Sequence, residues 1–147
     1  MKKHFLLLVL VLLCVKAQAQ TFATGHRSMT FTDASRSNRS IPAEIYYPAD
    51  VAGESVPLAA GGGNFPVVVF GHGFVMVWSA YDNIWNVLAQ NGFIAVFPTT
   101  ESGFSPNHTE FGKDLAYLVT ALQNEGADAA SPFYGRVDYS SAVMGHS

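Results

Sequence analysis

The chain has 147 residues, a net charge of −3, one cysteine and a mean hydropathy of +0.19. This length is within the range of one globular domain but is short for a complete catalytic α/β domain. The acidic balance argues against nucleic acid as a partner, because nucleic-acid binding depends on lysine and arginine contacts to phosphate.

The N-terminus predicts a secretory signal peptide over residues 1–19. A short basic start precedes an apolar run over residues 5–15 and an A-x-A cleavage site at residues 17–19. The run is shorter than the about 20 residues of a membrane span, so no stable span is expected; an uncleaved anchor is the alternative. Cleavage after Ala19 removes three lysines and the only cysteine. Five lysines and arginines then face eleven acidic residues, a net charge of −6, in a secreted or periplasmic protein without disulfides in this region.

The first part of the mature chain predicts antiparallel strands. Residues 20–47 alternate in places between apolar and polar side chains, which is typical of half-buried strands. The polar segment 33–40 between them predicts a turn. Residues 48–64 predict a loop, in which the three glycines 61–63 act as a flexible linker.

Three continuous apolar runs then predict a parallel sheet that is covered on both faces. They span residues 66–70, 93–97 and 141–144, and they end at Gly71, Pro98 and Gly145.

Two helical patterns lie between these runs. Ser79 is expected to cap the first helix, with Asp82 near its N-terminus and Gly92 as its stop. The second helix is expected over about residues 110–123, with Gly126 beyond its end. The side chains on one face of each helix are Tyr81, Ile84, Trp85 and Leu88 in the first, and Phe111, Leu115, Leu118 and Leu122 in the second. Strands that alternate with helices predict an α/β fold with crossover connections.

The last three residues, Gly-His-Ser, follow an apolar strand, as in the first half of a nucleophile elbow, Gly-x-Ser-x-Gly. In that motif a sharp turn exposes a serine hydroxyl, which becomes a strong nucleophile when a base takes its proton. We therefore predict Ser147 as a catalytic nucleophile. The alternative is an ordinary serine in a turn.

A second motif, Gly-His-Gly-Phe, follows the first parallel strand, at the sheet edge where α/β folds bind ligands. The backbone N–H of Phe74 is our candidate for an oxyanion donor, and the side chain of His72 is expected to bond the loop. Met76 and Trp78 lie in the apolar segment that follows. We predict that they line an ester pocket, and packing against the first helix is an equal alternative.

The remaining candidates are expected to have structural roles. Asp114 is predicted as a surface or helix-end charge, and Asp138 as a turn residue before the last strand. Phe104 and His108 are expected in a solvated loop, with the rim of the pocket as the alternative. The sequence contains no metal-ligand spacing and no phosphate loop, so neither a metal nor another cofactor is expected.

Segments 65–74, 85–98 and 143–147, in this order, make the sequence resemble the α/β-hydrolase superfamily. Within it, the likeness is to the chlorophyllase, dienelactone hydrolase and polyester-hydrolase (cutinase-like) group, over about residues 40–147. The resemblance implies a three-layer fold with a mostly parallel sheet and helices on both faces, of which residues 20–147 are the N-terminal part. It also implies a carboxylic ester hydrolase with a triad in the order Ser, Asp, His.

Only Ser147 can be matched to that triad, because the acid and the base would both follow it. The chain as given is therefore expected to be inactive on its own. The expected partner of the full protein is a small or polymeric ester. Alternative activities are a lipase, a phospholipid acetylhydrolase or a dienelactone-type hydrolase, although the last usually carries a cysteine nucleophile. A non-catalytic binding module of the same fold is the alternative from another class.

Overall fold

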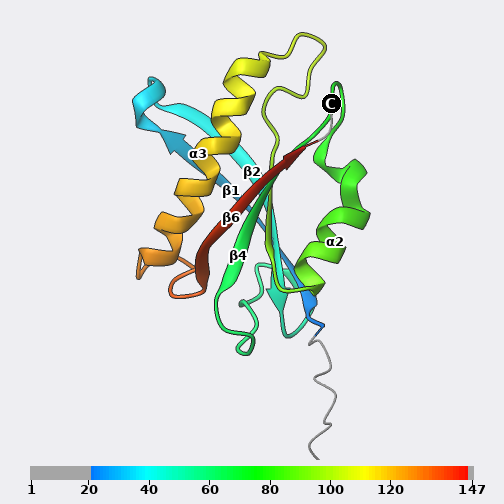
Figure 1. Cartoon of the computed structure of the whole chain (residues 1–147), viewed down its shortest axis with the longest axis vertical. Coiled ribbons are helices and arrows are strands. Elements are labelled where there is room, and N and C mark those ends of the chain that lie inside the picture. Colours follow the sequence, from blue (N-terminus) through cyan, green and yellow to red (C-terminus); the bar gives the residue numbers. More distant parts are fainter. Residues whose placement is uncertain (1–20, 146–147) are drawn as a thin grey trace, which may run out of the picture.

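The computed structural model describes residues 21–145, which form one mixed sheet with a helix on each face (Figure 1). The predicted signal peptide and the predicted nucleophile Ser147 lie outside the described residues. Within residues 21–145, none of the helices has the length and apolar character that crossing a membrane requires.

Residues 21–145 contain six strands and two α-helices, in nearly the predicted order. The strands are β1 (Ala23–Asp33), β2 (Arg39–Ala49), β3 (Gly53–Glu54), β4 (Phe65–Gly71), β5 (Ile94–Pro98) and β6 (Val137–Gly145). The helices are η1 (Ala34–Arg36), η2 (Trp78–Tyr81), α2 (Asp82–Gln90) and α3 (His108–Ala127), of which η1 and η2 are short 3-10 helices. The strand order across the sheet is β3-β1-β2-β5-β4-β6.

The antiparallel part of the sheet confirms the first predicted strands. β1 and β2 form a hairpin whose turn lies within the predicted segment, where the Asp33 carboxylate accepts a hydrogen bond from the Ser35 backbone N–H (3.0 Å). β2 also pairs antiparallel with β5. The prediction of a loop over residues 48–64 is wrong at two points, because β2 continues to Ala49 and β3 pairs with β1, Gly53 beside Gly25. A strand of two residues carries no periodic pattern that a sequence could reveal.

The parallel part, β5-β4-β6, confirms the three apolar runs as neighbouring strands. β6 begins earlier than predicted, so Asp138 lies inside a strand and its prediction as a turn residue before the strand is wrong. The register of β6 against β4 shifts between the pairs Phe65–Val137 and Val67–Ser141. Within this irregular segment the Asp138 carboxylate accepts the Ser140 N–H (2.6 Å), which is turn chemistry inside a strand.

Each helix covers one face of the sheet (Figure 1). Most of the predicted apolar side chains of both helices pack there. On the α2 face, an aromatic cluster contains the whole predicted stripe of Tyr81, Ile84, Trp85 and Leu88. On the α3 face, a larger and mainly aliphatic core contains Leu115, Leu118 and Leu122. The fourth residue of that stripe, Phe111, instead contacts the His72 ring, with 4.6 Å between the ring centroids.

Two predicted helix ends are wrong for reasons of tertiary packing. Ser79 caps nothing, because it lies in η2 and α2 begins only at Asp82 without a side-chain cap. Gly126 lies inside α3 rather than beyond it. A Cβ atom at Gly126 would lie 2.6 Å from Cβ of Val137, so glycine here lets the helix approach the start of β6. The predicted stop at Gly92 is confirmed, since this residue has φ +88° just after α2.

Candidate active site

The two sequence motifs leave neighbouring strands at the same edge of the sheet. Gly71, at the end of β4, pairs in parallel register with Gly145, at the end of β6. Phe74 follows Gly71 by three residues, and Ser147 follows Gly145 by two residues in the sequence. The pairing therefore brings the Gly-His-Gly-Phe motif beside the strand that leads to the predicted nucleophile.

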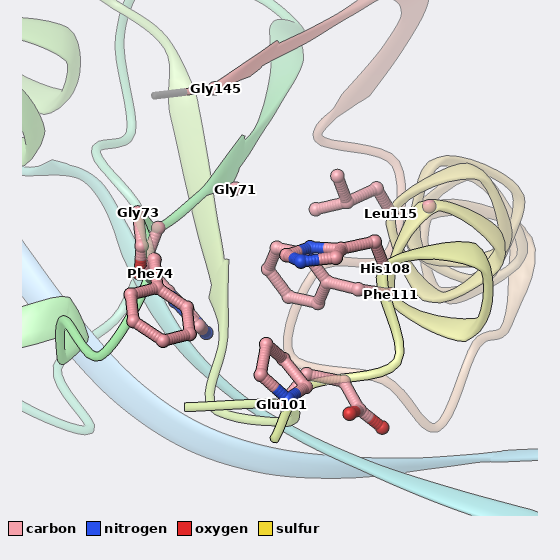
Figure 2. Close-up of a pocket in the computed structure, with 11 residues that line it drawn as sticks. Gly71, Gly73, Phe74, Glu101, His108, Phe111, Leu115 and Gly145 are labelled. Carbon is pink, nitrogen blue, oxygen red and sulfur yellow. Dashed lines mark hydrogen bonds between the residues drawn. The ribbon is translucent and has the colours of Figure 1, made fainter. Parts of the chain in front are cut away.

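A cavity of about 480 Å³ opens at this edge, on the α3 face. Figure 2 shows Phe74 on one side and the side chains of His108, Phe111 and Leu115 from α3 on the other. The full lining consists of Gly71, His72, Gly73, Phe74, Glu101, Pro106, His108, Phe111, Gly112, Leu115 and Gly145. The cavity is thus bounded by both strand ends, by the first turns of α3 and by the loop that precedes α3.

The strand end and α3 meet closely because Gly71 has no side chain. A Cβ atom at Gly71 would lie 3.0 Å from Cδ1 of Leu115 and 3.3 Å from Cε1 of Phe111. Glycine at this position therefore allows the apolar wall of the cavity to lie directly against the end of β4.

The segment after Gly71 forms a tight turn over residues 73–76. The Met76 N–H donates to the Gly73 carbonyl (3.0 Å), and Val75 has φ +55°, in the left-handed region. Within residues 21–145, no acceptor is found for the Phe74 N–H. A free backbone N–H beside the cavity is what an oxyanion donor requires, although the role of Phe74 stays a prediction.

The prediction that the His72 side chain bonds the loop is confirmed. The imidazole is 6% exposed, and its Nε2 lies 2.8 Å from the Thr100 carbonyl oxygen. Its Nδ1 lies 3.1 Å from the Gly73 carbonyl oxygen. His72 therefore joins the turn after β4 to the loop after β5.

The loop of residues 99–107, which follows β5, is held by a network of charged groups. The Asp114 carboxylate, fully buried on α3, accepts hydrogen bonds from both Nε (2.8 Å) and Nη2 (2.7 Å) of Arg39 and from the Thr100 hydroxyl (2.8 Å). Arg36 Nη1 lies 2.7 Å from the same carboxylate. The prediction of Asp114 as a surface or helix-end charge is wrong, because the β1–β2 hairpin brings two arginines over it.

Glu101 connects this network to the cavity. Its carboxylate accepts the Asn107 N–H (2.6 Å) and Nη2 of Arg39 (2.9 Å), and these contacts hold its pKa below the ordinary value. Burial raises the pKa of Asp114, but hydrogen bonds from Arg39, Thr100 and Arg36 outweigh burial, so this pKa also lies below its ordinary value. Both groups are therefore anionic at neutral pH.

His108, the first residue of α3, was predicted either in a solvated loop or at the rim of the pocket. His108 is exposed at the start of the helix, which Asn107 caps by accepting the Glu110 N–H (3.1 Å), and it lines the cavity. The rim alternative thus applies to His108. Phe104 is 86% exposed, as expected for a solvated loop.

Met76 and Trp78 lie on the other face of the sheet. Both pack against the aromatic cluster under α2, where the Trp78 ring lies 5.5 Å from that of Trp85. Neither lines the cavity, so the alternative of packing against the first helix describes them. Any role for these two side chains in binding an ester stays a prediction.

Two residues of the site carry no signal in the sequence. Glu101 has φ +59°, and its position depends on Arg39, which is distant in the sequence. The Tyr81 hydroxyl accepts the Gly73 N–H (2.8 Å), whereas the sequence pattern marks Tyr81 only as an apolar helix position. Within residues 21–145, no three His, Cys, Asp or Glu side chains are grouped so that they could hold a metal ion.

Comparison with known proteins agrees with this architecture. The structure is similar to that of a ferulic acid esterase from Streptomyces cinnamoneus, with a TM-score of 0.54 and 18% sequence identity. The match covers 90% of this chain and 54% of the esterase, so the chain spans about half the length of that protein. No curated protein matches the sequence significantly. The sequence model of the Chlorophyllase family matches residues 19–147, and the chain therefore belongs to the Chlorophyllase family.

Proposed function

We propose that this chain supplies the nucleophile and one oxyanion donor of a serine hydrolase that acts on carboxylic esters. The observation that carries the proposal is the parallel pairing of Gly71 with Gly145. It joins the Gly-His-Gly-Phe turn to the strand that leads to Ser147, beside a cavity with apolar walls. Membership of the Chlorophyllase family and the fold shared with an esterase support this proposal.

In the proposed reaction, Ser147 Oγ attacks the ester carbonyl carbon while a histidine base takes the hydroxyl proton. The carbonyl oxygen becomes an oxyanion, and the Phe74 N–H stabilises it; one such donor contributes about 3–4 kcal/mol. The bond to the alcohol oxygen then breaks, and the alcohol leaves with the proton. Water then attacks the acyl-enzyme carbonyl carbon while the histidine takes its proton. The bond to Ser147 Oγ breaks, the proton returns to Oγ, and the acid is released. As the resemblance to the α/β-hydrolase superfamily implies, we propose that the aspartate and the histidine of the triad follow Ser147 in the protein.

The apolar side chains of the cavity define which part of an ester fits there. Phe74, Phe111 and Leu115 offer carbon surface, and Glu101, whose carboxylate is paired with Arg39 (2.9 Å), also lines the cavity. An uncharged acyl or alcohol group would bury apolar area here, whereas a charged group would lose its hydration against the carbon surface. We propose neutral esters as substrates.

We also propose that residues 1–19 direct export and are removed after Ala19. The basic start, the apolar run and the A-x-A site support this. The mass of the N-terminal peptide of the protein recovered outside the cytoplasm tests the site. An intact Met1 on the exported protein would instead favour the anchor alternative.

The esterase proposal is tested with protein expressed from its complete coding sequence. Hydrolysis of p-nitrophenyl acetate and butyrate is measured for the wild type and for Ser147→Ala. We expect Ser147→Ala to lower kcat by about 10⁴-fold or more, because loss of the nucleophile removes the acyl-enzyme route. A fluorophosphonate probe should also add its mass to the peptide that contains Ser147.

Ser79→Ala is the matched control, since Ser79 is exposed in η2 and its side chain makes no hydrogen bond within the described residues. It should retain wild-type turnover and probe labelling. Equal turnover in wild type and Ser147→Ala would reject the proposal. We further propose that residues 20–147 alone show no turnover that depends on Ser147, and the same assay measures it.

A further inference from the structure

We propose that Tyr81 is a positioning residue for the oxyanion donor. Its hydroxyl holds the turn of residues 73–76 in the conformation that leaves the Phe74 N–H free at the cavity. This inference rests on the proposed function for its effect on catalysis. Its structural part can be tested without any esterase activity.

The Tyr81 hydroxyl links the two ends of the turn. Its oxygen accepts the Gly73 N–H (2.8 Å), and its proton is directed to Sδ of Met76 (3.3 Å). A phenol hydroxyl can accept and donate at the same time, and Tyr81 uses both capacities on residues of one turn. The side chain is 6% exposed, so water competes little for these contacts.

The turn needs such support because of Val75. This β-branched residue has φ +55°, in the left-handed region, where a residue with a Cβ atom costs about 1–2 kcal/mol. Strained backbone persists only where its surroundings hold it in place. Besides the Met76–Gly73 hydrogen bond that closes the turn, the contacts that hold it come from Tyr81 and His72.

The same contact decides which backbone amide is available. Gly73 and Phe74 supply consecutive N–H groups beside the cavity. The Gly73 N–H is taken by Tyr81, whereas within residues 21–145 the Phe74 N–H has no acceptor. Tyr81 thus selects the Phe74 amide as the donor that remains for an oxyanion.

Removal of the hydroxyl should leave the packing of the ring intact. The Tyr81 ring lies 4.8 Å from the Phe70 ring, within the cluster under α2. Tyr81→Phe preserves this contact and removes only the two hydrogen bonds. Tyr47→Phe is the matched control, because Tyr47 is also buried and donates its hydroxyl to a backbone carbonyl, that of Val56 (2.7 Å), away from the cavity.

The kinetic test uses protein from the complete coding sequence with p-nitrophenyl butyrate. We expect Tyr81→Phe to lower kcat by about 10- to 100-fold with KM changed less than about 2-fold. A misplaced Phe74 N–H weakens the stabilisation of the oxyanion in the transition state but leaves the binding of the ester nearly unchanged. Tyr47→Phe should retain the wild-type kcat. An equal fall of kcat in the two variants would overturn the proposal, since it would reflect a general loss of structure.

Val75→Gly supplies a rescue test. Glycine adopts a positive φ without strain, so the turn no longer depends on the hydroxyl. In the Val75→Gly background, Tyr81→Phe should lower kcat by less than about 3-fold. A loss as large as that in the wild-type background would contradict the positioning role.

Amide hydrogen exchange provides the readout that needs no activity. The Gly73 N–H should exchange at least about 10-fold faster in Tyr81→Phe than in the wild type, and at the wild-type rate in Tyr47→Phe. If the wild type hydrolyses no ester, the proposed function fails, but faster Gly73 exchange in Tyr81→Phe still supports the role of the Tyr81 hydroxyl in holding the turn. Unchanged Gly73 exchange in Tyr81→Phe overturns the inference.

Discussion

Two loops border the cavity at the carboxyl edge of the sheet, and they are held by different kinds of interaction. The turn of residues 73–76 is held by backbone amides, the Tyr81 hydroxyl and the His72 imidazole, with no carboxylate among these contacts. The loop of residues 99–107 depends on carboxylates and guanidinium groups, with Asp114 at the centre. Tyr81 reaches the first loop from the α2 face, and the two arginines of the β1–β2 hairpin hold the second. His72 links the two loops between Gly73 and Thr100.

The proposed oxyanion donor and the opposite wall of the cavity are therefore expected to respond differently to the loss of carboxylate charge. The turn of residues 73–76 should keep its conformation when carboxylates are protonated or replaced, because no carboxylate holds it. The opposite loop should lose its anchor when its carboxylates are protonated or replaced. The following experiments test this contrast, beginning with the largest effect.

Replacement of Asp114 by Asn should have the largest effect on stability. It leaves two arginines over a buried site without their shared carboxylate, and breaking a buried pair costs about 3–5 kcal/mol of unfolding free energy. Urea denaturation of the wild type and Asp114→Asn measures it. Exchange of the Gly73 amide should not change in the native state of the variant. A loss below about 1 kcal/mol would show that the network does not anchor the loop.

Acid should destabilise the protein through the same loop. The pKa values of Asp114 and Glu101 lie below their ordinary values in the folded state. Their contribution is therefore complete above the ordinary carboxyl pKa of about 4 and is lost as the pH falls through the folded values. Unfolding free energy measured between pH 7 and pH 3 should fall more steeply in the wild type than in Asp114→Asn. Equal slopes would contradict this assignment.

Val75→Gly should have a smaller effect, and in the opposite direction. It relieves about 1–2 kcal/mol of left-handed strain and adds about 0.5–1 kcal/mol of unfolded-chain entropy, so stability should rise by about 0.5–1 kcal/mol. Val77→Gly is the control, because Val77 has φ −108° and bears no such strain. Thermal unfolding should show a gain for Val75→Gly and a loss for Val77→Gly.

Lys113→Met should have the smallest effect. Lys113 forms an exposed pair with Glu110 on α3 (2.7 Å), and surface pairs of this type contribute about 0.5 kcal/mol or less. Urea denaturation should place this variant within about 0.5 kcal/mol of the wild type. If Lys113→Met lost as much unfolding free energy as Asp114→Asn, burial would not explain the difference expected between the buried and the exposed ion pairs.

The parts of the fold that were predictable are those with a local pattern. The strand runs before Gly71 and Gly145, the apolar stripe of α2 and the stop at Gly92 each depend on neighbouring residues, and all four are confirmed. The start of α2 was predicted wrongly at Ser79. Ser79 lies within the 3-10 helix η2, whose last residue, Tyr81, hydrogen-bonds the Gly73 N–H, so α2 begins three residues later than predicted from the cap.

The candidate site divides in the same way. The Gly-His-Gly-Phe motif could be placed at the sheet edge because strand-end motifs are read from consecutive residues, whereas Ser147 as the nucleophile stays a prediction. The position of Glu101 could not be identified, and the sequence left open whether His108 lines the cavity and whether Met76 packs under α2. These placements depend on which face of the sheet each loop reaches after it leaves its strand.

By itself, the sequence determined the α/β class, the order of most elements and the two strand ends, Gly71 and Gly145, that meet at the sheet edge, because periodicity and turn chemistry act over a few residues. Only the tertiary structure decided that Asp114 is a buried anchor, that Gly126 makes room for β6 and that Tyr81 holds the turn before Met76. The anchor and the space at Gly126 arise from residues that are distant in the sequence. The Tyr81 contact joins near neighbours, but through a strained turn that no propensity predicts.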